Sequence, residues 1–254
     1  MDIVKKLTNE FSRQDFTNSR EDLDAGELDK YKRIASGYAT IENAIAVLSD
    51  MHANTSYIYY GDFSDVLGLG KMTDKEDRIG SIWEEEILKL VSPDDLHNKY
   101  LHELRFFHFV KHLPKGRRHH YYLANKLRMK DSAGNYHAVL HRLFYVPEPN
   151  GNSLWLALCL YTPLTVDLPN GSVVVNSVTG ETEELEVKKD LKILSDRERQ
   201  VLRLIDKGLM SKNIAERLSI SINTVSRHRQ EILSKLQVKN SIEACRIAKD
   251  LGLI

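Results

Sequence analysis

Residues 194–244 constrain the fold of this chain more than any other stretch, because signals for helix starts and stops follow one another there. Ser195 stands three residues before Glu198, the spacing of a capping box in which each side chain accepts a hydrogen bond from the other residue's backbone N–H. An apolar helical face follows, and Gly208 supplies a left-handed stop. The spacing therefore predicts a compact bundle of short helices, the first of which begins at Ser195.

A tight turn should join the next two helices of this bundle. The second helix is expected to use Ser211 as its cap, and residues 219–222 should form the turn into a third helix of about residues 222–236. Burial of Val225 and Ile232 would fix the inner side of that helix. Two helices in this arrangement form a helix-turn-helix, and the outer side of the second one suits the edges of base pairs. The side chains expected on it are Asn223, Thr224, Ser226, Arg227 and Gln230.

The same run resembles the LuxR-type DNA-binding domain. The matching positions, in order, include Leu194-Ser195, Arg197-Glu198, Gly208, Ile214-Ala215, Thr224-Val225, His228, Lys235-Leu236, Val238, Asn240 and Glu243-Ala244. The resemblance implies four helices, of which the third enters the major groove and the fourth often makes a dimer contact. It implies base-facing roles for Thr224, Ser226, Arg227 and Gln230. It implies phosphate or scaffold roles for Lys212, His228 and Lys239.

Several positions depart from the usual pattern of this family. Met210 and Asn213 stand where a hydroxyl residue and glutamate are usual, Ser226 replaces a common lysine, and Ser241 replaces a common arginine. These changes leave the expected helix-turn-helix fold unaltered. The DNA sequence that the domain binds cannot be inferred from the resemblance.

The distribution of charge agrees with DNA binding by this tail. Residues 191–254 hold 13 Lys and Arg against 7 Asp and Glu, whereas the whole chain is balanced at 36 and 36. A basic tail and an acidic front are expected when a DNA-binding domain is joined to a regulatory one.

Apolar residues recur at helical spacing in the front part of the chain, from about residue 27 to 50. Ile34, Tyr38, Ile41, Ile45 and Leu48 recur at intervals of three and four, which predicts an amphipathic helix from about residue 27 to 50. Two interpretations remain open for its apolar seam. The helix could form a short coiled coil, or it could pack on the sheet of its own domain.

The order of elements after that helix resembles a PAS domain. A strand at 56–60 precedes short helical turns, a helix of about 93–112 opened by Ser92-Pro93, and three strands at 119–130, 136–146 and 153–162. The expected fold class is α+β: a PAS-like antiparallel sheet with flanking helices, and a C-terminal four-helix LuxR-type helix-turn-helix domain. The expected divisions are a helical segment at 1–50, the PAS-like sensory or dimerisation domain at 51–168, a hairpin and linker at 169–190, and the DNA-binding domain at 191–254.

The residues that could carry chemistry in the front domain favour structural roles. Cys159 lies in an apolar strand and is expected to be an inert core thiol, and no disulfide with Cys245 is expected. His108 and His112 are one helical turn apart, but no carboxylate or cysteine stands at a matching spacing. We therefore expect no metal site and no catalytic residues, and the cofactor, if any, stays unknown. Enzyme motifs are also missing, because Asp65 occupies a position that a phosphate-binding loop gives to glycine.

The sequence thus predicts a cytoplasmic, DNA-binding transcription regulator controlled by a PAS-like front domain. Its expected partners are double-stranded DNA, a second copy of the chain, and a small ligand in the front domain. No signal peptide is indicated, and the longest apolar run, 154–161, is too short to span a membrane. Two alternatives compete: a PAS-based scaffold whose helical tail docks a protein, and a sigma-factor-like protein, which the β-rich front opposes.

Overall fold

The computed structural model resolves the chain into two compact units, Met1–Glu184 and Leu185–Ile254. The first is called the front unit here and the second the C-terminal unit, and each is described by itself. The residues that the structure describes are 3–16, 25–69, 76–166, 168, 171–184, 194–236, 238, 240–250 and 253–254. Among these, no helix is both long and apolar enough to cross a bilayer.

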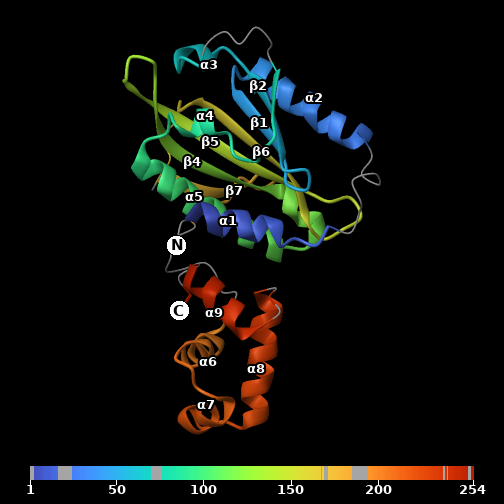
Figure 1. Ribbon diagram of the computed structural model, residues 1–254, viewed down its shortest axis with the longest axis vertical. Coiled ribbons are helices and arrows are strands. Elements are labelled where there is room, and N and C mark those ends of the chain that lie inside the picture. Colours follow the sequence, from blue (N-terminus) through green and yellow to red (C-terminus); the bar gives the residue numbers. More distant parts are fainter. Residues whose placement is uncertain are drawn as a thin grey trace. The chain divides into compact units, whose positions relative to one another are not determined.

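The front unit is an antiparallel sheet with helices on both faces (Figure 1). Its strands are β1 (Ile45–Asp50), β2 (Thr55–Tyr60), β3 (Glu76–Ile79), β4 (Tyr121–Lys130), β5 (Tyr136–Pro147), β6 (Leu154–Pro163), β7 (Ser172–Asn176) and β8 (Thr182–Glu183). Its helices are α1 (Ile3–Ser12), α2 (Ala25–Ile41), α3 (Phe63–Val66), α4 (Glu85–Leu88), α5 (Pro93–His112) and the 3-10 helix η1 (Lys115–His120). In the described residues the strand order is β3-β2-β1-β6-β5-β4-β7-β8.

Strands β1, β2 and β6 are buried on both faces of the sheet, whereas β4 and β5 alternate between buried and more exposed residues. On one face, Ala35 and Ala39 of α2 pack with Leu48, Leu156 and other side chains of the central strands. Helices α1 and α5 lie over the other face (Figure 1). The predicted α+β class is confirmed, and so is the cap of α5: the Ser92 side chain accepts a hydrogen bond from the Asp95 N–H, with Pro93 at the first helical position.

The predicted helix of residues 27–50 is wrong in its second half. Helix α2 ends at Ile41, Asn43 takes a positive φ of 52°, and β1 begins at Ile45. Strand β1 is buried along its whole length, so its apolar residues do not alternate as a half-exposed strand would. Of the two interpretations of the helix, packing on its own sheet is the one observed. The predicted seam is also shifted, because Ile41 is 83% exposed and the small Ala35 and Ala39 are buried instead.

Two of the expected domain divisions cut through this sheet. A division after residue 50 would separate β1 from its hairpin partner β2, and a division after residue 168 would remove β7, which pairs with β4. The hairpin expected around Gly180 is present as β7 and β8, but it belongs to the sheet rather than to a linker. The chain divides after Glu184.

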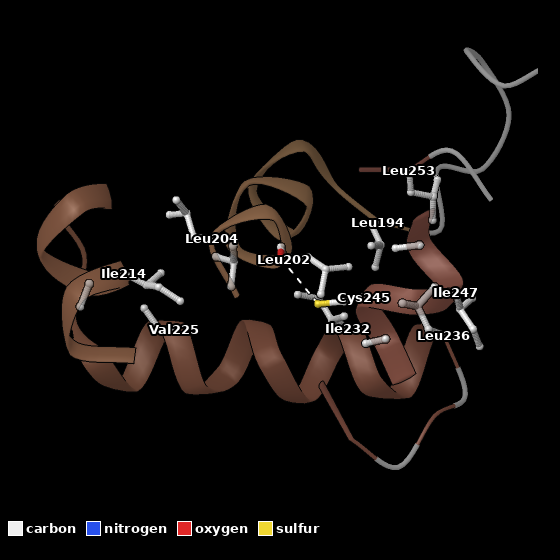
Figure 2. Close-up of a cluster of buried hydrophobic side chains, with 14 residues drawn as sticks. Leu194, Leu202, Leu204, Ile214, Val225, Ile232, Leu236, Cys245, Ile247 and Leu253 are labelled. Atoms are coloured by element: carbon white, nitrogen blue, oxygen red, sulfur yellow. Dashed lines mark hydrogen bonds between the residues drawn. The ribbon is translucent and has the colours of Figure 1, made fainter. Parts of the chain in front are cut away.

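In the described residues of the C-terminal unit, four helices surround one apolar core (Figure 2). The helices are α6 (Asp196–Asp206), α7 (Ser211–Leu218), α8 (Ile222–Lys235) and α9 (Ser241–Asp250). Ser195 and Glu198 form the predicted capping box at the start of α6, and Gly208 has the predicted positive φ. Figure 2 shows Leu202 of α6, Ile232 of α8 and Cys245 of α9 close together in the core, and Val225 of α8 beside Ile214 of α7. Cys159 and Cys245 are both buried free thiols.

Candidate nucleic-acid interface

A tight, hydrogen-bonded turn fixes the angle at which α8 leaves α7. Ser219 closes α7 in the left-handed conformation at φ 53°, and the Ile220 N–H donates to the Ala215 carbonyl at 3.0 Å. Ser221 then caps α8, since its hydroxyl accepts a hydrogen bond from the Thr224 N–H at 3.0 Å. Residues 219–221 therefore form the turn of the helix-turn-helix, and a hydrogen bond to a backbone group closes the helix end on each side of it.

Helix α8 has one buried side and one open side. Val225 and Ile232 anchor it in the core at 0% and 1% exposure. The first half of the opposite side carries four exposed polar residues, which are Asn223, Ser226, Arg227 and Gln230. This orientation is the one that the spacing predicts, and contact of these side chains with DNA stays a prediction.

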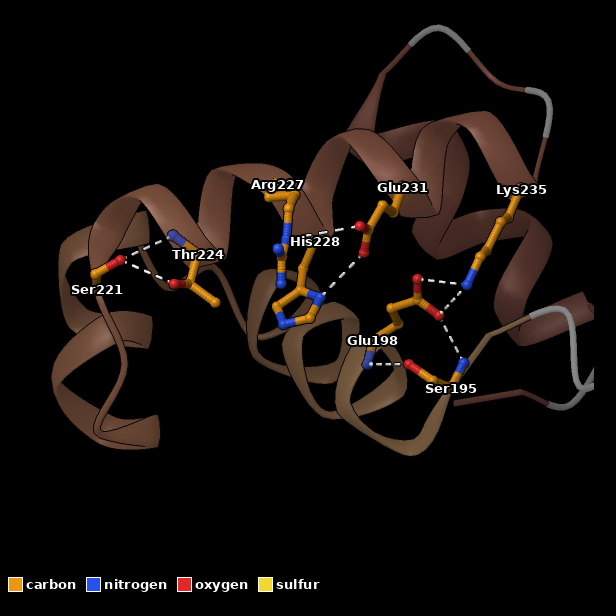
Figure 3. Close-up of polar contacts among 8 residues, drawn as sticks. All are labelled: Ser195, Glu198, Ser221, Thr224, Arg227, His228, Glu231 and Lys235. Atoms are coloured by element: carbon orange, nitrogen blue, oxygen red, sulfur yellow. Dashed lines mark hydrogen bonds and ion pairs between the residues drawn. The ribbon is translucent and has the colours of Figure 1, made fainter.

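Arg227 is the long cationic side chain on the open side of α8. Its side chain is 68% exposed, and its Nε lies 3.6 Å from Glu231 Oε1, one helical turn away (Figure 3). Exposed pairs of this kind contribute little free energy. Arg227 can therefore leave Glu231 at small cost and offer its guanidinium to the two acceptors on the edge of guanine.

Comparison with known proteins agrees with this geometry. Residues 192–248 match the family described as "Bacterial regulatory proteins, luxR family". Residues 192–248 form a helix-turn-helix domain of the LuxR family. Among curated relatives, the oxygen regulatory protein NreC of Staphylococcus epidermidis is 37% identical over 86 residues, which are 33% of this chain and 39% of NreC. The transcriptional regulatory protein DesR of Bacillus subtilis is 48% identical over 59 residues, which are 23% of this chain and 30% of DesR.

The chain spans less than two fifths of the length of either relative. A solved structure of phage VqmA in complex with DPO aligns over 89% of this chain and 92% of its own. It does so at 15% identity and a TM-score of 0.31, too low to support an argument about the front unit.

Two predicted DNA-facing residues of the LuxR-family domain have partners within it. The Thr224 hydroxyl lies 2.8 Å from the Ser221 hydroxyl and is part of the helix cap. The His228 side chain is only 13% exposed, and its Nδ1 lies 3.4 Å from Glu231 Oε2 (Figure 3). Of the two roles that the family resemblance implies for His228, its burial favours the scaffold. Lys212 is exposed in the first turn of α7, and Lys239 lies outside the described residues.

Arg229 holds three helices of the domain together, a role that the sequence analysis did not foresee. Its Nη1 donates to the Ser211 hydroxyl at 2.9 Å, and its Nη2 donates to the Ser241 hydroxyl at 3.0 Å. The prediction that Ser211 caps α7 is wrong. The N-cap position is Met210, and the Ser211 hydroxyl accepts a hydrogen bond from Arg229 instead. The guanidinium thus ties the middle of α8 to the first residues of α7 and α9.

Glu198 joins the start of α6 to the end of α8. Its carboxylate accepts a hydrogen bond from the Ser195 N–H at 2.6 Å and from the Lys235 ammonium at 2.7 and 2.8 Å (Figure 3). Burial alone would raise the pKa of Glu198, but these hydrogen bonds lower it overall. Glu198, His228 and Glu231 bring ligand atoms within 4.8 Å of one another. Lys235 donates a hydrogen bond to each Glu198 oxygen, so we attribute this cluster of ligand atoms to ion pairing and not to a metal site.

Replacing Glu198 by alanine is expected to lower the free energy of unfolding of the LuxR-family domain by about 1–3 kcal/mol, because the Ser195 N–H and the Lys235 ammonium lose the buried carboxylate that accepts their hydrogen bonds. The lowered pKa adds a pH dependence. The carboxylate stabilises the domain above its unfolded pKa of ~4.3 and loses this effect as the pH falls through the lowered folded value. Chemical denaturation followed by helix circular dichroism at neutral and acidic pH measures both effects. An acid dependence that is the same in the variant as in the parent would contradict the assignment.

Proposed function

We propose that this protein is a sequence-specific DNA-binding transcription regulator that reads the major groove with α8. The observation that carries the proposal is the two-sided helix: Val225 and Ile232 hold it in the core, while Asn223, Ser226 and Arg227 stand exposed on its leading half. Membership of residues 192–248 in the LuxR family supports it, and so does the excess of basic residues in the C-terminal unit. Access to chromosomal DNA places the proposed activity in the cytoplasm.

The front unit is proposed to control this activity. Its order of elements resembles that of a PAS-like sensor: the β1–β2 hairpin, the short helices α3 and α4 with β3 between them, the long helix α5, and the three long antiparallel strands β4, β5 and β6. Because the two units have separate cores, a change in the front unit can alter the availability of the C-terminal unit without unfolding it. A small ligand bound against the sheet is the proposed signal.

A homodimer is the proposed DNA-binding form. Ile242 at the start of α9 is 86% exposed and Met210 is 76% exposed, and both line a hollow of about 640 Å³ on the C-terminal unit. Large apolar side chains that stand this far into solvent are common at contacts between proteins. Two paired copies would read half-sites about one helical turn, roughly 10–10.5 base pairs, apart. Selection of binding sites from random duplex DNA with the full chain tests this, and a single unpaired half-site would contradict the dimer.

Replacing Arg227 by alanine is expected to reduce the preference for one base pair of the selected site by about 1–3 kcal/mol, because its bidentate contact to guanine would be lost. Arg203, an exposed arginine of α6, provides the matched control. Arg203→Ala removes the same charge but should leave base preference unchanged. Fluorescence anisotropy with the selected duplex and its single-base variants measures the difference. Equal discrimination by Arg227→Ala and the parent protein would overturn the assignment of α8 as the reading helix.

The dependence of affinity on salt separates DNA binding from the protein-docking alternative. A domain that neutralises several phosphates releases counterions, so its affinity falls steeply as the salt concentration rises. Binding to duplex that is weak at low ionic strength and indifferent to salt would favour the scaffold interpretation.

A further inference from the structure

A groove of about 520 Å³ lies on the front unit between β2, β3 and α4, and its lining is unusually acidic. Four carboxylates line it, from Asp77, Glu84, Glu85 and Glu86, and none of its described lining residues is lysine, arginine or histidine. Tyr60 and Trp83 add aromatic surface, and isoleucine side chains supply most of the remaining wall. A volume of this size suits a small organic molecule.

Glu84 forms the inner end of this acidic groove. The residue is only 4% exposed, and the Tyr161 hydroxyl donates to its Oε1 at 2.7 Å. Trp83 and Glu84 also line a second, inner cavity of about 30 Å³, which is room for about two waters. Glu84 therefore lies between the groove and a small, mostly apolar chamber that Lys99 and Glu103 also line.

The charges in that chamber do not balance. Lys99 and Glu103 are buried, and the Lys99 ammonium lies 2.7 Å from Glu103 Oε1. Among the described residues that line this chamber, Lys99 is the only Lys or Arg and Glu84 and Glu103 are the only carboxylates, and the ion pair of Lys99 is with Glu103. Within the described residues no ion pair involves Glu84, so its carboxylate leaves a net negative charge at the end of the groove. Burying a charge without a counter-charge is costly, which makes this position attractive to a cation.

The mouth of the groove carries the same sign of charge. Burial raises the pKa of Tyr60, and the carboxylates of Asp77 and Glu86 raise it further. Glu86 is paired with Lys89 at 2.6 Å on the surface. The net negative charge of the lining therefore comes from Asp77, Glu84 and Glu85.

A metal ion does not fit this lining. Among the described residues, ligand atoms of three or more His, Cys, Asp or Glu side chains converge within 4.8 Å at two places, and neither includes a groove carboxylate. The place in the front unit joins Glu103, His141 and Cys159. There the Ser172 hydroxyl donates to Asn125 Oδ1, which turns the Asn125 amide nitrogen toward His141 Nδ1 at 3.1 Å. His141 therefore carries its hydrogen on Nε2, the nitrogen that faces Glu103, and cannot offer a lone pair there.

We propose that the acidic groove binds a small organic cation, a protonated amine with an apolar or aromatic body, whose ammonium pairs with Glu84 while the body lies against Tyr60 and Trp83. A charge-assisted hydrogen bond to a buried carboxylate and a cation above aromatic rings are both strengthened by exclusion of water. The inference names a ligand class for the front unit, and to that extent it rests on the proposed ligand control.

Trp83 provides a direct reporter of this site, because the chain has two tryptophans and the other, Trp155, packs on the far face of the sheet with α2. In full-length protein with Trp155→Phe, the remaining fluorescence comes from the groove wall. The probes are phenethylamine and cyclohexylmethylamine, each compared with the alcohol that has a hydroxyl in place of the amine. Each amine is expected to change the fluorescence of Trp83 saturably and to bind roughly tenfold or more tightly than its alcohol.

Glu84→Gln keeps the shape of the side chain and removes its charge, and it should reduce amine affinity by about tenfold or more. Glu27→Gln, which changes an exposed glutamate on α2, is the matched control and should bind amines as the parent does. Equal binding of amine and alcohol, no binding of either amine, or undiminished amine binding by Glu84→Gln would overturn the proposal. If Glu84→Gln fails to fold, Asp77→Asn at the mouth makes the same comparison, with a smaller loss expected.

A DNA-binding measurement on the same protein separates this site from the proposed control of transcription. Amine binding that depends on Glu84 but leaves DNA affinity unchanged would support the cation site and contradict ligand control. DNA binding that responds to other compounds, without any response of Trp83 to amines, would overturn the cation site and leave ligand control standing.

Discussion

Replacing Lys99 by methionine is expected to lower the free energy of unfolding of the front unit by about 3–5 kcal/mol, because the buried carboxylate of Glu103 would lose its cation. Lys99 is charged in the folded protein at neutral pH. Burial alone would lower the pKa of its ammonium, but the carboxylates of Glu103 and Glu84 raise it overall. Urea denaturation followed by tryptophan fluorescence measures the loss, since Trp83 and Trp155 both lie in the front unit.

Two further variants test whether the loss comes from the unpaired charge. Lys99→Met combined with Glu103→Leu removes both partners, and it should recover most of the stability because apolar side chains of similar size replace a buried pair at little cost. Lys89→Met breaks the exposed pair with Glu86 and should have little effect. A double variant as unstable as Lys99→Met would show that the loss arises from packing rather than from charge.

The second large effect is expected in the C-terminal unit. Replacing Ile232 by alanine should lower its free energy of unfolding by about 2–5 kcal/mol, because a side chain of α8 that is 1% exposed would leave a cavity among α6, α8 and α9. Ile222→Ala removes the same atoms at a position of the same helix that is 49% exposed, and it should cost far less.

The composition of the chain makes this effect separable from the first. Residues 191–254 contain no Phe, Trp or Tyr, so tryptophan fluorescence reports on the front unit alone. Ile232→Ala should therefore shift the unfolding seen by helix circular dichroism and leave the fluorescence transition in place. Specific DNA binding should fail at the temperature at which the C-terminal unit unfolds. A parallel shift of both transitions would mean that the two units unfold as one.

The C-terminal unit was predictable from the sequence because its helices are defined by local signals. The Ser195–Glu198 capping box and the stop at Gly208 act over a few residues, and the structure has both. Strand β1 was not predictable in this way. Ile45 and Leu48 continue the helical spacing of α2, and this stretch is a strand because it pairs with β2 and with β6, the latter more than a hundred residues later.

The polar contacts that hold each unit together could not be predicted from the sequence either. Lys99 and Glu103 are four residues apart on a helix, a spacing typical of solvated surface pairs, and their burial depends on the sheet that α5 covers. The ties from Arg229 to Ser211 and Ser241 join three helices, so no local pattern contains them. Residue spacing identified the open side of α8, and it could not say that Thr224 and His228 have partners within the domain.

The central place of β1 has a consequence for how the protein is made on the ribosome. The β1–β2 hairpin emerges early, yet Ile45 pairs with Tyr161 of β6, which is synthesised much later. Until β6 arrives, the nascent chain carries an apolar strand with an unpaired edge, which is the form most prone to join another chain. Nascent front units should therefore depend on chaperones during translation, whereas the helices of the C-terminal unit find their partners within a few dozen residues.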